Sequence, residues 1–495
     1  MKPLMLCLLV VAGIARGALE LPAIFSDHAV LQRDRAVPVW GWAEPGGSVT
    51  VAIAGQEAKA TAGADGKWRV DLPKLDAKGP QTLTVTAGSE TKTIQDVLVG
   101  EVWLASGQSN MAMTVSRAKD FNKERAAAKL PEIRVFTERS AASAQMNDRP
   151  TGTWVVCTPE TVGSFSATAF FFGREIHQAL QAPVGIINSS VGGTPIESWI
   201  RLDVQHAHPA LKEYFAGREK GKAAFDPVQM KAVYEKQLAN WKKAAQAAKA
   251  AGKTVPRQPQ DPIAVRARKG EVGGLFNGKI APLIPYAIRG ALWYQGEANS
   301  SADKAQFYQH QLPLLVQDWR GRWGYEFPFA WVQLPNYASG RGEGWMRVRE
   351  AALKSVQSVP NSGMAVTLDI GEEKNIHPNN KQEVGRRLAL WALGTVYGKE
   401  RHSQPWPVKH EVKDGAIQLT MTEPVRLEGE GGFVIAGADK VWHPAKAEVR
   451  DKTLIISSAA VTEPVAVRYA WEEMPKVTLW TEQGIPVTQF RTDSW

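Results

Sequence analysis

Residues 97–110 read VLVGEVWLASGQSN, an apolar run that ends in Gly-Gln-Ser-Asn. A continuous apolar run that ends in a turn predicts a strand buried on both faces, as in a parallel sheet covered by helices. Ser109 stands where the next helix is expected to begin. Its hydroxyl is therefore expected at the carboxyl edge of the sheet, and its N–H among the unpaired amides of a helix start. Taken alone, the segment favours a simpler role, in which Ser109 or Asn110 only caps the helix.

Similar apolar runs recur along the middle of the chain, at residues 184–188, 287–294, 329–334 and 364–368. Helical patterns lie between them, at residues 167–180, 302–319 and 381–396. Repeated alternation of strand and helix predicts an α/β domain with a mainly parallel sheet. Ligands bind at the carboxyl ends of the strands in such sheets, so the polar residues that follow each strand become candidates for a site.

Three further strand ends carry polar residues or glycines. Gly192-Gly193-Thr194 follows the run at 184–188, and its exposed N–H groups suit a close approach of substrate. The segment WYQGEAN, residues 293–299, supplies an amide and a carboxylate, Gln295 and Glu297. Glu297 is a candidate general base, but the sequence supports a structural role equally.

The fourth strand end leads to His377, the residue type whose pKa suits the activation of a serine hydroxyl. Each of the four segments alone has a structural interpretation. Together they bring a nucleophile, a base and oxyanion donors to one rim, which is the constellation that acyl transfer requires.

The regions on either side of the α/β pattern read as β-structure, and the length of 495 residues itself predicts more than one domain. Residues 18–95 hold short Val- and Thr-rich runs separated by turn signals, which predicts a β-sandwich. Residues 405–495 return to the same texture and predict a C-terminal β-domain. The catalytic region is expected over 96–404, interrupted by an Ala- and Lys-rich helical insertion at 205–262 whose charged face is expected to be solvated.

The first 17 residues have the positive start, short apolar run and small-x-small end of a signal peptide. A secreted or periplasmic protein is therefore expected, with no membrane attachment after the signal is removed. The formal charge of +9 accompanies no basic-aromatic pattern or motif for nucleic-acid binding. Cys157 would be the one cysteine left after processing, which excludes an intrachain disulfide and a cysteine metal site. We expect Cys157 to be a buried small apolar residue.

Four segments in this order, GQSNM, GGTPIESW, WYQGEAN and IHPNNKQEVGRRLA, resemble the sialate O-acetylesterase family of SGNH-type hydrolases. The segments LPAIFSDHAVLQRD and VRYAWEEMPKVTLWTEQGIPVTQFRTD, near the two ends, resemble it as well. The resemblance implies a three-layer α/β/α flavodoxin-like catalytic domain with flanking β-domains, and neither a metal nor an organic cofactor. It implies that Ser109 is the nucleophile and His377 the general base. It also implies an oxyanion hole made of the Ser109 amide, the Gly193 amide and the Gln295 side chain, with Gly192 as the alternative glycine.

One position departs from the pattern of many SGNH hydrolases, which place an aspartate three residues before the catalytic histidine. Lys374 stands there, and a lysine cannot accept the histidine N–H. Asp369, Glu372, Glu373 or a backbone carbonyl is then the orienting partner. We expect Asp369, because it ends a strand and so has a fixed position. A Ser-His dyad without a third member is the alternative.

The expected substrate is an O-acetylated sialic acid or another acetylated glycan. A sialic acid carboxylate would suit an arginine clamp, and Arg349 is the candidate, with Arg347 beside it in WMRVRE. A surface salt bridge is the alternative role for these arginines. Two other functions remain open at this point: an acetylesterase acting on plant polysaccharides such as acetylxylan, and a catalytically inactive carbohydrate-binding protein.

Overall fold

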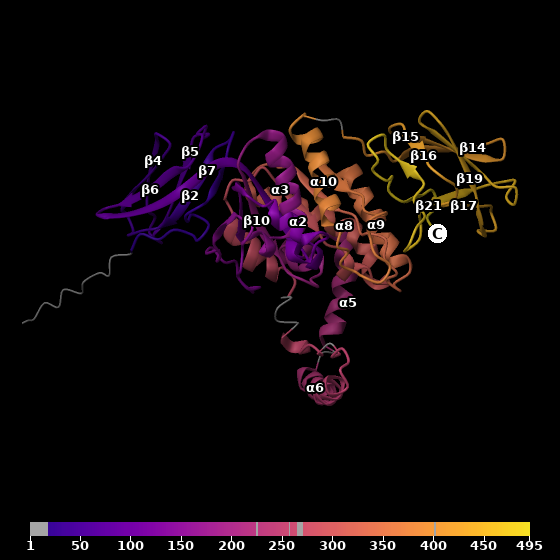
Figure 1. Cartoon of the computed structure of the whole chain (residues 1–495), viewed down its shortest axis with the longest axis horizontal. Helices are drawn as coiled ribbons and strands as arrows, with labels where there is room; N and C mark the ends of the chain where they lie inside the picture. The colour runs from indigo at the N-terminus through magenta and orange to yellow at the C-terminus, as the bar shows by residue number, and fades with distance from the viewer. Residues whose placement is uncertain (1–17, 224–225, 257, 265–270, 400–401) are drawn as a thin grey trace, which may run out of the picture.

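The computed structural model describes residues 18–223, 226–256, 258–264, 271–399 and 402–495. Three regions follow one another along an elongated molecule, with β-structure at both ends and helices around a sheet in the middle (Figure 1). The expected signal peptide, residues 1–17, lies outside the described residues. Within the described chain, no helix combines the length and the apolar character needed to cross a membrane.

The central sheet has the strand order β13-β12-β11-β7-β10-β8-β9. All neighbouring pairs are parallel except β8 with β9 at the edge. The buried runs of the sequence form its centre, whereas β8 and β9 are strands that the apolar runs did not indicate. The bounds are β7 Glu90–Gly107, β8 Leu130–Thr137, β9 Trp154–Cys157, β10 Val184–Ser190, β11 Gly290–Tyr294, β12 Phe329–Val332 and β13 Ser362–Ala365.

Two pairs of helices cover the two faces of this sheet. Helices α3 (Ala167–Leu180) and α10 (Lys381–Trp391) pack against each other, and their apolar residues share one core with Trp103. Helices α8 (Ala302–Trp323) and α9 (Glu343–Ser358) pack together, and their residues lie in the other core. The expected three-layer α/β/α architecture with additional β-domains is confirmed.

Strand β7 belongs to two parts of the molecule. Its first half pairs antiparallel with β6, and its second half pairs parallel with β10 and β11. The strand runs unbroken through Asp96, where the sequence suggested that the catalytic region begins. The remaining N-terminal strands are β1 Val30–Gln32, β2 Val37–Trp42, β3 Ser48–Ile53, β4 Gln56–Thr61, β5 Lys67–Leu72 and β6 Gln81–Ala87.

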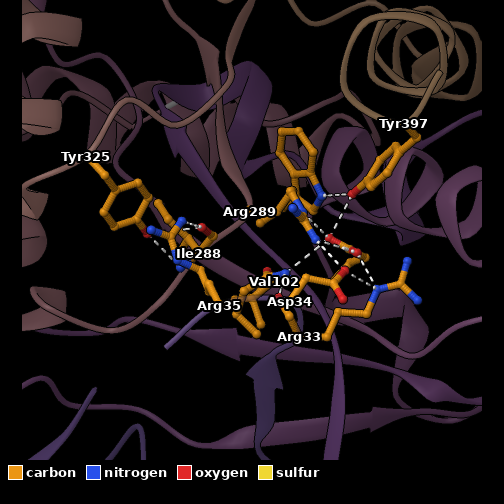
Figure 2. A network of polar contacts seen from close by, with 11 residues as sticks. Arg33, Asp34, Arg35, Val102, Ile288, Arg289, Tyr325 and Tyr397 are labelled. Carbon is orange, nitrogen blue, oxygen red and sulfur yellow. Dashed lines mark hydrogen bonds and ion pairs between the residues drawn. The ribbon is translucent and has the colours of Figure 1, made fainter. Parts of the chain in front are cut away.

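A buried carboxylate lies where β7 enters the central sheet. The Glu101 side chain is fully buried and accepts hydrogen bonds from Arg33 Nε (2.6 Å), Arg289 Nε (2.6 Å) and Tyr397 Oη (3.0 Å). Burial alone would raise the Glu101 pKa, but hydrogen bonds and charges from the two arginines outweigh it and lower the pKa. Figure 2 shows Arg33, Arg289 and Tyr397 of this network. It also shows Arg35, whose guanidinium lies 3.3 Å from the centre of the Tyr325 ring.

Helices α5 Lys212–Ala223 and α6 Pro227–Ala250 of the insertion project away from the body of the molecule (Figure 1). Helix α4 Leu202–Ala207, where the insertion begins, contacts α8 instead. At the base of this projection, Arg218 Nη1 donates to the buried Glu197 Oε1 at 2.9 Å. Glu197 Oε2 in turn accepts from Asn299 Nδ2 at 3.0 Å, so α5 is tied to the segment that follows β11.

The C-terminal region contains two four-stranded sheets and a short ribbon, with the orders β14-β15-β20-β19, β18-β17-β21-β23 and β16-β22. Its strands are β14 Pro407–Lys413, β15 Ala416–Met421, β16 Arg426–Leu427, β17 Phe433–Ala436, β18 Trp442–Pro444, β19 Lys446–Arg450, β20 Thr453–Ser457, β21 Ala466–Tyr469, β22 Leu479–Trp480 and β23 Phe490–Arg491. Two short helices between β7 and β8 are α1 Ser109–Ala112 and α2 Phe121–Ala126.

Candidate active site

The turn after β7 presents Ser109 at the rim of the sheet. Gly107 has φ +132°, and a Cβ there would overlap the Tyr294 carbonyl on the neighbouring strand, so this position requires glycine. Ser109 is the first residue of α1, so its N–H has no acceptor within that short helix. The nucleophile expected from the sequence is thus held on a sharp turn between a strand and a helix.

His377 meets Ser109 from a distant part of the chain. His377 Nε2 lies 2.8 Å from Ser109 Oγ, although the two residues are 268 positions apart. This is hydrogen-bonding distance, and a neutral imidazole with its proton on Nδ1 would accept the serine proton at Nε2. The arrangement can therefore activate the hydroxyl for attack on a carbonyl carbon.

Glu372 holds the loop that carries His377. Its Oε2 accepts from Asn375 Nδ2 at 3.0 Å, and its Oε1 accepts from the Asn379 N–H at 2.7 Å. Asn375 Oδ1 in turn accepts from the His377 N–H at 3.0 Å. One carboxylate thus clamps the loop on both sides of the histidine.

Asp369, the expected orienting partner of His377, has a different partner. Its two carboxylate oxygens accept from Arg387 Nη1 at 2.6 Å and Nη2 at 2.7 Å. Arg387 also donates to the Val366 carbonyl. Asp369 lies in the turn after β13 and does not end the strand, and the bidentate pair ties this turn to helix α10 and satisfies the Arg387 fork. Asp369 is therefore placed as a structural residue and not as the acid of a triad.

The two glycines after β10 form the opposite wall of the nucleophile turn. A Cβ on Gly192 would lie 3.4 Å from Ser109 Cβ, an ordinary van der Waals distance, so this glycine lies beside the serine. Gly193 has φ +71°, a conformation that disfavours residues with a side chain. Thr194 Oγ1 closes the turn on the Val191 carbonyl at 2.7 Å. The turn that carries the expected glycine pair therefore lies next to the serine.

Gln295, expected as a third oxyanion donor, lies underneath this turn. The residue is buried, and its Nε2 donates to the Thr194 carbonyl (3.1 Å), to Asn299 Oδ1 (2.8 Å) and to Gln108 Oε1 (3.2 Å). An amide nitrogen has two protons, and protein oxygens already surround it. In this structure Gln295 supports the Thr194 turn and does not present a donor to a substrate.

Arg349, expected to bind a substrate carboxylate, is completely buried. Its guanidinium donates to the backbone carbonyls of Leu334, Pro335, Glu472 and Glu473. Burial lowers its pKa to about 9. The assignment as a substrate clamp is wrong, and so is the alternative of a surface salt bridge, because the side chain joins the segment after β12 to the C-terminal region. Arg347, by contrast, is partly exposed and pairs with Glu343 one helical turn away.

The structure adds residues that sequence reasoning missed. Asn110, considered only as a helix cap, is fully buried and contacts both Glu297 and Lys381. Glu297, considered as a general base, accepts from Asn110 Nδ2 at 2.5 Å, and burial raises its pKa. Lys381 lies in the segment IHPNNKQE, quoted for its resemblance alone, and nothing in the local pattern marks it as a buried cation.

Within the described chain, no group of three or more His, Cys, Asp or Glu side chains is placed to hold a metal ion. Cys157 is buried, as expected, and burial raises the pKa of its thiol to about 12, so it is a poor nucleophile.

A family model described as "Carbohydrate esterase, sialic acid-specific acetylesterase" matches residues 99–251 and 278–393. The chain is 29% identical to the sialate O-acetylesterase of Rattus norvegicus, over 95% of this chain and 93% of that protein. It is 28% identical to the sialate O-acetylesterase of Homo sapiens, over 91% of this chain and 87% of that protein.

The crystal structure of the carbohydrate acetylesterase XAC1771 from Xanthomonas citri is similar over 97% of this chain and all of that chain, with 34% identity and a TM-score of 0.80. These relatives support an acetylesterase that acts on glycans, and they make the protein a carboxylic ester hydrolase. The chain belongs to the carbohydrate esterase family of sialic acid-specific acetylesterases.

Proposed function

We propose that the protein removes O-acetyl groups from sialic acids on glycans through a covalent acetyl-serine formed at Ser109. The observation that carries the chemistry is the 2.8 Å contact between His377 Nε2 and Ser109 Oγ. His377 takes the serine proton as Oγ attacks the acetyl carbonyl carbon, and a tetrahedral intermediate forms. His377 then gives the proton to the departing sugar oxygen, and water activated by the same histidine releases acetate.

The oxyanion of this intermediate needs donors on the far side of Ser109 from the histidine. We propose the Ser109 amide and an amide of the Gly192-Gly193 pair, with Gly193 as the first choice from the sequence. The helix start at Ser109 and the position of Gly192 beside the serine support this placement. Gln295 contributes indirectly, since its amide fixes the Thr194 carbonyl beside the glycines.

The choice of sialic acid is supported by the family description and by the names of the mammalian relatives. A second candidate substrate is an acetylated plant polysaccharide such as acetylxylan. The Xanthomonas citri structure is consistent with it, because that protein is a carbohydrate acetylesterase and is 34% identical to this chain. A catalytically inactive binding protein is disfavoured by the intact Ser109–His377 contact.

One assay separates these substrates. Acetate release is measured for the wild-type protein and Ser109→Ala on O-acetylated sialic acid, on acetylxylan and on a simple aryl acetate. The proposal expects hydrolysis of the aryl acetate and the sialic acid ester by the wild type, and none by the variant. If the wild type hydrolysed acetylxylan and not the sialic acid ester, the second candidate substrate would replace the first.

We further propose that residues 1–17 are a signal peptide and that the mature protein is secreted or periplasmic. The charged start and short apolar run of the sequence support this. N-terminal sequencing of protein recovered from the periplasm or medium tests it, and a mature form that still begins at Met1 would contradict it.

A further inference from the structure

A buried polar unit lies directly behind the nucleophile. Asn110 follows Ser109 in the chain, and its side chain is fully buried. Its Nδ2 donates to Glu297 Oε1 at 2.5 Å and to the Ile376 carbonyl at 2.9 Å. Ile376 immediately precedes His377, so one side chain connects the turn of the nucleophile to the loop of the base.

The opposite end of the Asn110 amide is also occupied. Lys381 Nζ donates to Asn110 Oδ1 at 2.6 Å, and Lys381 is fully buried at the start of helix α10. Its ammonium lies 5.1 Å from the centre of the Tyr294 ring. Glu297 is buried too, and its Oε2 has no hydrogen-bond partner among the described residues. An acid and a cation are therefore held on either side of one amide.

The partners leave Asn110 a single amide orientation. Lysine has only donors, so the oxygen of the amide must face Lys381. A main-chain carbonyl has only acceptor sites, so the nitrogen must face Ile376, and it then meets Glu297 as well. A rotation of the amide by 180° would break all three contacts, and the side chain cannot find water as a substitute because it is buried.

We propose that Asn110, oriented by Lys381 and Glu297, is a positioning residue that fixes the loop of His377 against the turn of Ser109. The inference rests on the proposed roles of Ser109 and His377 and adds to them. Asn110 is not placed to touch the substrate. Its effect is on the distance between base and nucleophile, to which proton transfer is highly sensitive.

The pKa shifts of Lys381 and Glu297 are consistent with strong coupling of both groups to Asn110. Burial lowers the pKa of Lys381 to about 7, against the opposing attraction of Glu297 and Glu372, and Arg117 lowers it further. Burial raises the Glu297 pKa, although the Asn110 hydrogen bond and the charge of Lys381 act in the other direction. Neither group is well solvated, so each depends on the amide between them.

The variant Asn110→Asp tests the hydrogen bonds of Asn110 with almost no change in the shape of the side chain. It replaces the nitrogen by an acceptor that faces two other acceptors, Glu297 Oε1 and the Ile376 carbonyl, while the bond from Lys381 survives. The proposal expects kcat to fall by about 100-fold, with KM on an aryl acetate nearly unchanged. A folded Asn110→Asp protein with wild-type kcat would overturn the proposal.

A compensating change gives the second arm. In Asn110→Asp/Glu297→Gln the new amide donates to the introduced carboxylate, so the acid-amide contact is restored with its direction reversed. The proposal expects about tenfold recovery of kcat relative to the single variant, with the Ile376 contact still lost. No recovery in a folded double variant would overturn the proposed geometry.

Two further variants keep the proposal testable if Asn110→Asp does not fold. Lys381→Met keeps the length of the side chain and removes the donor, and is expected to lower kcat by about tenfold at unchanged KM. Wild-type kcat in this variant would also overturn the proposal.

Glu101→Gln is the control, because it disturbs a buried ion cluster about 20 Å along β7 from the turn and is expected to leave kcat and KM unchanged. Wild-type turnover by Ser109→Ala would instead refute the proposed function, so the two failures are distinguishable.

Discussion

Removing the Glu372 carboxylate, which holds the loop of His377, is expected to lower the catalytic rate. In Glu372→Ala the contacts to Asn375 Nδ2 and to the Asn379 N–H disappear together. The loop keeps its bond from the His377 N–H to Asn375, but Asn375 loses the group that orients it. The histidine is then held in its productive position by fewer contacts.

The size of the effect follows from the two lost hydrogen bonds. Bonds to a charged group contribute about 1.5–3 kcal/mol each when buried, and less here because Glu372 is half-exposed. A total of about 2 kcal/mol in favour of the productive loop corresponds to about 30-fold in kcat. Glu372→Gln is expected to fall between the two proteins, since its amide keeps an acceptor for Asn379 but turns a donor toward Asn375.

The assay is steady-state hydrolysis of an aryl acetate, with Asp369→Asn as the matched control. That variant breaks the bidentate pair with Arg387 and is expected to cost stability while leaving kcat near the wild-type value. Unchanged kcat in folded Glu372→Ala would refute the reasoning. A larger loss in Asp369→Asn than in Glu372→Ala would also refute it, and would restore Asp369 as the partner of the histidine.

Three other predictions concern buried charges. Arg349→Met leaves buried carbonyls without donors and is expected to destabilise the protein by about 3–5 kcal/mol in urea titrations, while KM for sialylated and neutral acetyl esters stays unchanged; a selective rise in KM for the acidic substrate would contradict this. Glu101→Gln is expected to cost about 2–3 kcal/mol near neutral pH, because Arg33 and Arg289 keep some solvent contact. The lowered pKa makes this contribution present above the unfolded value of about 4.5, so the difference from wild type should vanish as pH falls through the folded pKa; a difference that persists there would contradict it. Lys381 has a folded pKa of about 7 against 10.5 when unfolded, so between these values the unfolded chain binds the extra proton. The stability of wild type relative to Lys381→Met should therefore rise with pH in that window, with a slope approaching about 1.4 kcal/mol per pH unit, and a flat difference in pH-dependent melts would count against it.

The architecture was largely predictable because buried parallel strands leave a strong apolar signal. The run at 97–105 lies within β7, and the helix expected at 167–180 has the observed bounds of α3. Parallel strands bring their carboxyl ends to one edge, so Ser109, the Gly192-Gly193 pair and His377 could be expected together before any geometry was known. Strand β8 was missed, since LPEIRVFT mixes charged and apolar residues and gives no continuous run.

The supporting residues were harder to predict, since their partners are distant in the chain. Asn110 and Glu297 are 187 positions apart, and Asn110 and Lys381 are 271 apart. Arg349 is different, because its burial could have been predicted from the sequence. It lies four residues after Trp345 and three before Ala352, on the apolar face of α9, where an arginine needs internal partners.

The central claim is that His377 activates Ser109 for covalent attack. The most direct measurement is labelling with an aryl phosphonate ester, followed by mass spectrometry of the peptide that carries the adduct. The account predicts one adduct on Ser109 in the wild type, formed far more slowly in His377→Ala and absent in Ser109→Ala. An adduct on another residue, or labelling at the wild-type rate without His377, would contradict it.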